Sequence, residues 1–242
     1  MNYLFLHKIF SLSILLFLYT SQSNAQKGDF ENALTFIESI KPSKYIRIDS
    51  VLKPFERDSA KMNLLLATSK ANAYNEGSCY ALNALGVINR NISNYDKSIK
   101  FHQEAKQYAE KANSEELRII SLNMIGVAYR RMDVIKPALD YHSEALKIAY
   151  SVINPSNTVN RSIAVSQNSI GNIYLALKQY DLAISQFNKS LEIEKKADNK
   201  LGLAINYHNI GYAEEAKGNL LKGLYNTVAG VAYVSATHLP AD

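Results

Sequence analysis

Two histidines, His102 and His142, are the pair in this sequence whose type and spacing come closest to metal chemistry. Each stands sixteen residues after a glycine, Gly86 or Gly126, so the two occupy equivalent positions forty residues apart. Two imidazoles are too few for a zinc site, which takes three or four protein ligands, and the sequence suggests no third. We therefore expect half-buried histidines that pack between helices, and neither a metal nor another cofactor.

No catalytic motif accompanies these histidines. The sequence contains no His-Glu-x-x-His, no Gly-x-Ser-x-Gly, no phosphate-binding glycine loop and no Cys-x-x-Cys. Its single cysteine, Cys79, lies among apolar residues of a predicted helix, which favours packing over reactivity. An enzyme is the competing class, and it lacks a convergent acid, base and nucleophile. We predict no catalytic activity.

The elements that position these residues are predicted by a repeat. Leu-Gly or Ile-Gly steps recur at Gly86, Gly126, Gly171 and Gly211, at intervals of 40, 45 and 40 residues. Such a period is typical of stacked two-helix units rather than one globular core. Helices are expected at about 77–91 with 95–111, 115–131 with 134–152, 160–177 with 180–196, and 201–217 with 219 onward. Small residues stand twelve positions after each glycine, and we expect them to face it where the two helices approach: Ser98, Ala138, Ala183 and Gly223.

Large residues around each glycine complete the pattern. A mostly large residue lies four positions before the glycine, and an aromatic or histidine lies sixteen positions after it in three units. This resembles the tetratricopeptide repeat over residues 76–225, and the exported repeat regions of bacterial sensor histidine kinases and membrane-linked regulators are similar. The resemblance implies an all-α fold, a right-handed superhelical solenoid of antiparallel helix pairs. It also implies a protein or an extended peptide as partner, bound on the concave face.

Within that resemblance, one face of each first helix points into the concave groove. Its residues three before each glycine, one after it, and near the helix end are Asn83, Asn123, Asn168, His208, Val87, Val127, Asn172, Tyr212, Arg90, Arg130 and Arg131. Asparagine amides donate and accept at once, so this row suits the backbone of a bound peptide, and the arginines favour a carboxylate-bearing one. The alternative is that the asparagines bond to neighbouring helices and tie the units together.

The first 25 residues follow a different pattern. Lys8 precedes an apolar run from Ile9 to Tyr19, and Ser23-Asn24-Ala25 resembles a signal-peptidase site. Eleven apolar residues are too few for a membrane-spanning helix, which needs about 20. We expect a signal peptide cleaved after Ala25 and an exported protein, periplasmic or secreted, with no stable membrane span. An uncleaved anchor is the alternative.

The remaining divisions are a helical cap with a degenerate repeat at 26–75, and an atypical tail at 226–242. No charged residue occurs from Gly223 to Ala241, so we interpret the tail as a truncated or altered end that is poorly ordered or is covered by a partner. The chain is then either an exported scaffold or the N-terminal sensory fragment of a longer signal-transduction protein. Its net charge of +5 comes from dispersed lysines, which does not indicate nucleic-acid binding.

Overall fold

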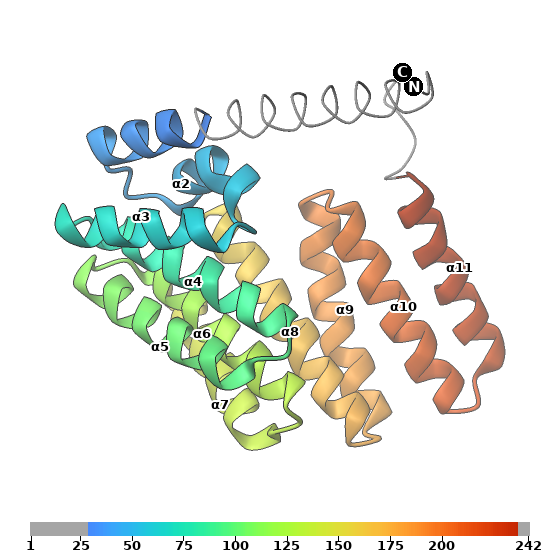
Figure 1. Ribbon diagram of the computed structural model, residues 1–242. Coiled ribbons are helices and arrows are strands. Elements are labelled where there is room, and N and C mark those ends of the chain that lie inside the picture. The colour runs from blue at the N-terminus through green and yellow to red at the C-terminus, as the bar shows by residue number, and fades with distance from the viewer. Residues whose placement is uncertain (1–28, 237–242) are drawn as a thin grey trace, which may run out of the picture.

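The computed structural model describes residues 29–236, and these form a row of antiparallel helix pairs (Figure 1). The predicted all-α solenoid is confirmed, and the described part of the chain contains helices and no strand. The first helices of the pairs are α4 (Asn75–Asn91), α6 (Glu115–Arg131), α8 (Asn157–Ala176) and α10 (Lys200–Ala216). The second helices are α5 (Tyr95–Lys111), α7 (Ile135–Ser151), α9 (Tyr180–Lys196) and α11 (Leu220–Ala236). None of the described helices is both long and apolar enough to span a bilayer.

Helix ends follow from local hydrogen bonds. Ser114 caps α6 by accepting a bond from the Leu117 amide at 3.3 Å, and Ser156 caps α8 through the Val159 amide at 3.2 Å. At the other end, a residue with positive φ reverses the chain after α4, where Ser93 has φ of 61°. The Asn94 amide then bonds back to the Asn89 carbonyl at 2.9 Å, which satisfies a carbonyl that the helix leaves unpaired.

The long interval between Gly126 and Gly171 divides its extra residues between a loop and a helix. Residues 152–156 separate α7 from α8, whereas residues 112–114 separate α5 from α6. Helix α8 has 20 residues, and the other first helices have 17.

In the first three units the atoms nearest to the repeat glycine belong to the residue sixteen positions later, not to the small residue twelve positions later, whereas Gly211 lies against both Thr227 and the Gly223 backbone. A Cβ atom added to Gly86 would lie 2.4 Å from the His102 ring, and one added to Gly171 would lie 2.6 Å from the Phe187 ring. The packing reason for Gly86, Gly126 and Gly171 is therefore a flat ring laid on the backbone. His102 and His142 are fully buried rather than half-buried, because this contact places each ring between the two helices of its unit.

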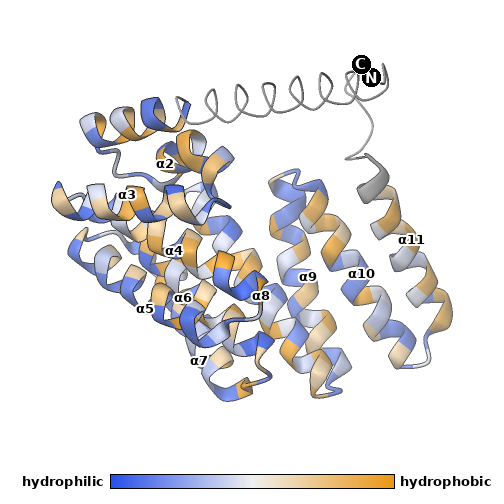
Figure 2. Ribbon diagram, viewed as in Figure 1, coloured by the Kyte–Doolittle hydropathy of each residue, from blue (hydrophilic) through white to orange (hydrophobic). Residues whose placement is uncertain are grey.

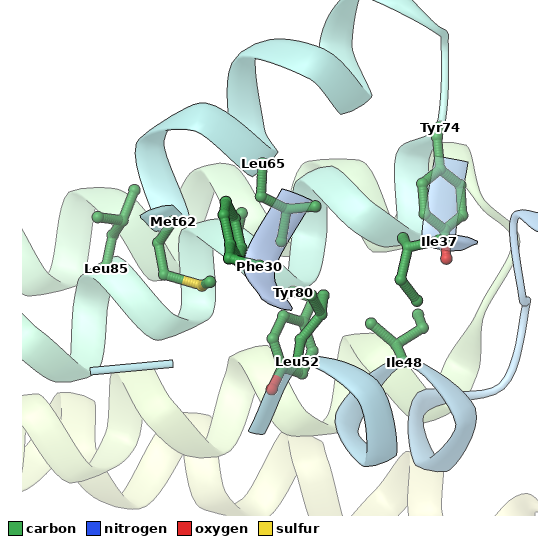
Figure 3. Packing of buried hydrophobic residues seen from close by; sticks show 10 residues of the cluster. Phe30, Ile37, Ile48, Leu52, Met62, Leu65, Tyr74, Tyr80 and Leu85 are labelled. Carbon is green, nitrogen blue, oxygen red and sulfur yellow. The ribbon is translucent and has the colours of Figure 1, made fainter. Parts of the chain in front are cut away.

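The N-terminal part of the described chain folds against the first pair. A helix over residues 29–40 and α3 (Ser59–Ala71) flank a short α2 (Tyr45–Leu52) and the 3-10 turn η1 (Lys53–Phe55). Figure 3 shows their shared core, in which Phe30, Ile48, Leu52 and Leu65 gather beside Tyr80 of α4. Residues 1–28 lie outside the described residues, and with them the predicted signal peptide and its cleavage site.

Candidate functional site

A cavity of about 480 Å³ lies where α2 and η1 meet the inner side of α4 and α6. Its lining combines apolar, aromatic and charged side chains from these elements and the turns that follow them: Tyr45, Lys53, Glu56, Arg57, Tyr80, Asn83, Ala84, Val87, Ile88, Arg90, Asn91, Ile92, Ile120 and Met124. Three of the predicted groove residues, Asn83, Val87 and Arg90, are among them. The cavity is the part of the predicted groove that the N-terminal segment encloses.

An aromatic pair forms one wall of this cavity. The rings of Tyr45 and Tyr80 lie 5.7 Å apart, and both hydroxyls donate to the same oxygen of Asp49 at 3.1 Å. Burial first, and then the Asp49 charge, raises the pKa of both phenols, so both remain protonated donors at neutral pH. The wall is therefore neutral apart from Asp49, whose carboxylate receives both hydroxyls.

Helix α2 is held in place from the opposite side by Glu116 of α6. One oxygen of this carboxylate accepts a bond from the Tyr45 amide at 3.0 Å, and the other accepts a bond from the Ser156 hydroxyl at 2.5 Å. Glu116 thus satisfies the N-terminus of α2 and also binds the residue that caps α8. We call this contact the Glu116 clasp.

Three arginines gather near the ends of α4 and α6. Arg90 is largely buried and donates to the Met124 sulfur at 3.6 Å. Burial, and then the charges of Arg131 and Arg130, lower the pKa of the Arg90 guanidinium, though arginine remains charged. None of the three forms an ion pair within the described residues, and the buried Arg130 Nε has no hydrogen-bond partner there. This end of the cavity is electropositive, and no described carboxylate forms an ion pair with Arg90 there.

Asn83 and Asn123 form hydrogen bonds within the protein. Asn83 donates to the Ser121 hydroxyl at 2.9 Å, and its carbonyl oxygen lies 2.8 Å from Nδ1 of His102. Asn123 donates to the Ser162 carbonyl at 2.9 Å and lies 3.0 Å from Nδ1 of His142. Both amides are buried and fully engaged, which corresponds to the alternative that they tie the units together. Their place in the predicted peptide-binding row stays a prediction, and Asn83 also lines the cavity.

Asn168 takes part in the same chain of contacts with different partners. Its amide donates to Asn206 at 3.0 Å, and its carbonyl oxygen accepts a bond from Asn172 at 3.0 Å. In the second, third and fourth units the residue five positions before the glycine is polar and bonds to the asparagine of the preceding unit. Ser121 and Asn206 accept from Asn83 and Asn168, and the Ser166 hydroxyl donates to the Asn123 carbonyl oxygen. The polar residue at this offset is the sequence signal that would have identified the inter-unit bonds.

The other predicted groove residues are spread along the array. Val87 and Val127 are half-buried, Arg131 is exposed, and only Val87 lines the cavity. His208 and Tyr212 are exposed on α10, at the other end of the row of pairs. His208 borders a separate cleft of about 350 Å³ between α10 and α11. The eleven residues therefore do not form one site.

The two buried histidines have a defined protonation state. The Asn83 and Asn123 amides are committed to other acceptors, so each histidine must donate from Nδ1 to the asparagine oxygen. Nε2 is then unprotonated and lies without a partner against the glycine. Burial, and then a neighbouring arginine, lowers the pKa of each to about 3.

The histidines and the cysteine offer no ligand set. The described residues contain no group of three His, Cys, Asp or Glu side chains able to hold a metal ion. Cys79 is buried, and burial raises the pKa of its thiol to about 12, so it is unreactive at neutral pH.

Comparison with known proteins gives a family and a fold. The family model of the tetratricopeptide repeat matches residues 77–151 and 162–222. No curated protein matches the sequence. Among solved structures, BtubC (BKLC) from P. vanneervenii superposes with a TM-score of 0.66 at 15% identity, covering 92% of this chain and 94% of that one. A putative kinesin light chain with TPR-like repeats from P. anserina has a TM-score of 0.52 at 12% identity, covering 88% and 96%. At such identities the likeness concerns the fold alone.

Proposed function

The chain belongs to the tetratricopeptide repeat family, whose repeats make it a protein-binding scaffold, and on that premise we propose that it binds the carboxylate end of an apolar peptide outside the cytoplasm. The binding site in this proposal is the cavity between α2, η1, α4 and α6. The family is generally non-catalytic, and binding rather than turnover is the activity proposed.

The uncompensated charge of Arg90 carries the proposal. A guanidinium that is largely buried, close to Arg130 and Arg131, and without an acidic partner in the described chain is electrostatically unfavourable by itself. A carboxylate removes that cost and accepts two parallel N–H bonds from the arginine fork. The apolar lining from Val87, Ile120 and Met124 then accommodates the apolar side chain of the terminal residue, whose backbone bears the carboxylate.

The size of the cavity supports a short segment rather than a long peptide. A volume of about 480 Å³ lies within the range of ~300–1,000 Å³ that ligand pockets occupy, which is enough for one or two residues. Because α2 covers the inner face of α4, a peptide cannot lie along the whole first unit. We therefore propose that the terminal residue enters the cavity and that the rest of the peptide leaves along α6 and α8.

An exported location is part of the proposal. It is supported by the Ile9–Tyr19 run and the Ser23-Asn24-Ala25 motif. The alternative is a sensory region of a longer signal-transduction protein such as a histidine kinase or a transcriptional regulator. In that case the bound peptide is a signal that the longer protein detects, rather than part of a protein that the scaffold holds.

The test is a titration with fluorescein-labelled tetrapeptides that end in Leu, Ile or Phe, each made with a free and with an amidated C-terminus. We expect the free form to bind at least ten-fold more tightly, because a hydrogen bond to a charged group contributes about 1.5–3 kcal/mol. Arg90→Gln should remove this preference. Arg47→Gln is the matched control, because Arg47 is exposed on α2 and does not line the cavity. Equal binding of free and amidated peptides, or an unaffected Arg90→Gln variant, contradicts the proposal.

A further inference from the structure

Each unit of the array packs on the next through equivalent positions. The second helix of one unit lies against the first helix of the next, so α5 packs on α6, α7 on α8, and α9 on α10. The residues nine and thirteen positions after the repeat glycine are on this side of the second helix, and Ile99 of α5 joins Ile125 and Ala128 of α6 in one buried cluster. In the three earlier units none of them is exposed: Tyr95 and Ile99, Ile135 and Leu139, and Tyr180 and Ile184.

Helix α11 presents the same side uncovered. Its residues at these two offsets are Leu220 and Leu224, which are 67% and 63% exposed. Thr227, sixteen positions after the glycine, is half-buried, whereas the corresponding residues of the earlier units are fully buried. Among the described helices α11 packs extensively against α10 alone, and Figure 2 shows its apolar residues at the edge of the array. The side of α11 that a following unit would cover is therefore open within residues 29–236.

The hydrogen bonds between first helices lack a further member at the same place. In each earlier unit the residue three positions before the glycine bonds to the first helix of the next unit, as Asn168 does when its amide donates to Asn206 at 3.0 Å. His208 has this position in α10, and it is exposed and without a hydrogen-bond partner in the described chain. It also borders the cleft of about 350 Å³ between α10 and α11, which has a mainly apolar lining.

We propose that Leu220, Leu224, Thr227 and His208, which we call the α10–α11 face, bind an amphipathic helix of another protein in the place that the first helix of a following unit takes. The earlier units specify the chemistry of that helix. The first helices that fill this place carry four buried residues on one side, an apolar residue, a Ser or Asn, an apolar residue, and an Ala or Ile, spaced three or four apart. They are Leu117, Ser121, Ile125 and Ala128 in α6; Ile163, Ser166, Ile170 and Ile173 in α8; and Leu203, Asn206, Ile210 and Ala213 in α10. The Ser or Asn of the bound helix is the partner of His208.

A second copy of this chain does not supply such a helix from its described residues. The side that would enter the face is already buried in α6, α8 and α10, and in α4 it is covered by α3, where Ala81 and Leu85 join Met62 and Leu65 in one core. The α10–α11 face and the surface that fills it are different parts of the chain, so a contact of this kind between copies is not self-complementary. It would require one copy to open its own array. The occupant is therefore a helix of another protein.

A synthetic helix with the sequence of Glu115–Arg131 is the probe, because α6 fills the equivalent place on α4 and α5. A single peptide of this length is marginally helical in water, so a lactam between Ile119→Glu and Asn123→Lys holds it helical. These two positions lie on the opposite side of the helix from Leu117 and Ser121, and the bridge stays clear of the docking side. Circular dichroism checks that the probe is helical before binding is measured.

Fluorescence anisotropy of the fluorescein-labelled probe with the full chain tests the face. Leu224→Asp should weaken binding by about ten-fold or more, because it places a charge where the probe covers an apolar side chain. Leu221→Asp is the matched control and should bind like the parent. Leu221 is 85% exposed on the same helix, but its offset carries residues that stay exposed in the earlier units: Asp96, Lys136 and Asp181. Failure of the helical probe to bind the parent, or an equal loss in the two variants, overturns the proposal.

A double-mutant cycle tests the polar contact. Ser121→Ala in the probe should weaken binding to the parent by about three-fold or more, as expected for one hydrogen bond, and should have no further effect on His208→Ala. An equal loss with both proteins contradicts His208 as the partner. Sedimentation velocity at the same concentrations should show a monomeric parent. A dimer that excludes the probe assigns the face to a second copy and overturns a helix of another protein as its occupant.

Discussion

Acid is expected to destabilise the packing between the paired helices through protonation of His102 and His142. Both are buried with Nδ1 donating to asparagine, and burial holds their pKa near 3, well below the ordinary value of 6.5. A histidine whose pKa is lowered by folding stabilises the protein fully above its unfolded pKa. That stability is lost as pH falls, because the unfolded state takes up the proton first. The sensitive window therefore lies between about pH 6.5 and 3.

The magnitude follows from the size of that window. Each unit of pH below 6.5 lowers the free energy of unfolding by about 1.4 kcal/mol for each histidine. At pH 5 the two together cost roughly 4 kcal/mol, a large fraction of the 5–15 kcal/mol typical of a folded domain. Glu194 acts in the opposite direction, because burial raises the pKa of its carboxyl and favours the protonated form of the folded state. Comparison of parent and variant cancels that contribution.

His142→Phe is the informative variant, because the chain already places Phe187 against Gly171 at the same offset. The Asn123 oxygen keeps the Ser166 hydroxyl at 2.5 Å, so it does not lose every donor. Urea unfolding followed by circular dichroism at pH 7.5 and pH 5 should show that this variant loses about 2 kcal/mol less on acidification than the parent. An equal loss in both proteins would refute the assignment of a buried neutral histidine.

Two further changes test the seams. Gly126→Leu should lower the free energy of unfolding by about 1–3 kcal/mol, because even a Cβ at this position would lie 2.8 Å from the His142 ring. An unchanged melting temperature would contradict the close packing of the His142 ring on Gly126. His102→Phe should lower the free energy of unfolding by about 1–3 kcal/mol, because the Asn83 oxygen loses the donor at His102 Nδ1. Adding Val87→Asn should restore most of that free energy. In the third unit, where Phe187 stands in place of the histidine, Asn172 donates to the Asn168 oxygen from the same offset. Simple additivity in that double-mutant cycle would exclude the substitution of one donor for the other.

The helix pairs were predictable because the repeat spacing and the helix ends are local properties. Ser114 is followed by two glutamates, and this pattern alone specifies where α6 starts. What faces Gly126 was not predictable in the same way. Ala138 and His142 lie one helical turn apart, and either position satisfies the periodicity, so only the three-dimensional packing decides that the ring meets the glycine.

The site was less predictable than the fold for a physical reason. An amide such as Asn83 fits a peptide or a neighbouring helix equally well, and Ser121, which decides between them, lies 38 residues later. The wall from α2 has no counterpart in any repeat, and Asp49 reaches Tyr80 across 31 residues. Arg90 was predicted to lie beside the groove and it lines the cavity, but its missing ion-pair partner is a property of the folded surroundings.

The Glu116 clasp has a consequence for the order in which the array opens. Most helices contact only those one or two places away in sequence, so unfolding can begin at an end and advance unit by unit. Glu116 instead joins the backbone of Tyr45, 71 residues earlier, to Ser156, 40 residues later. Helices α2, α6 and the start of α8 are thereby closed into one cooperative block. We expect the block to resist fraying from the N-terminal side, so that local opening begins at α11 and proceeds through α10 and α9.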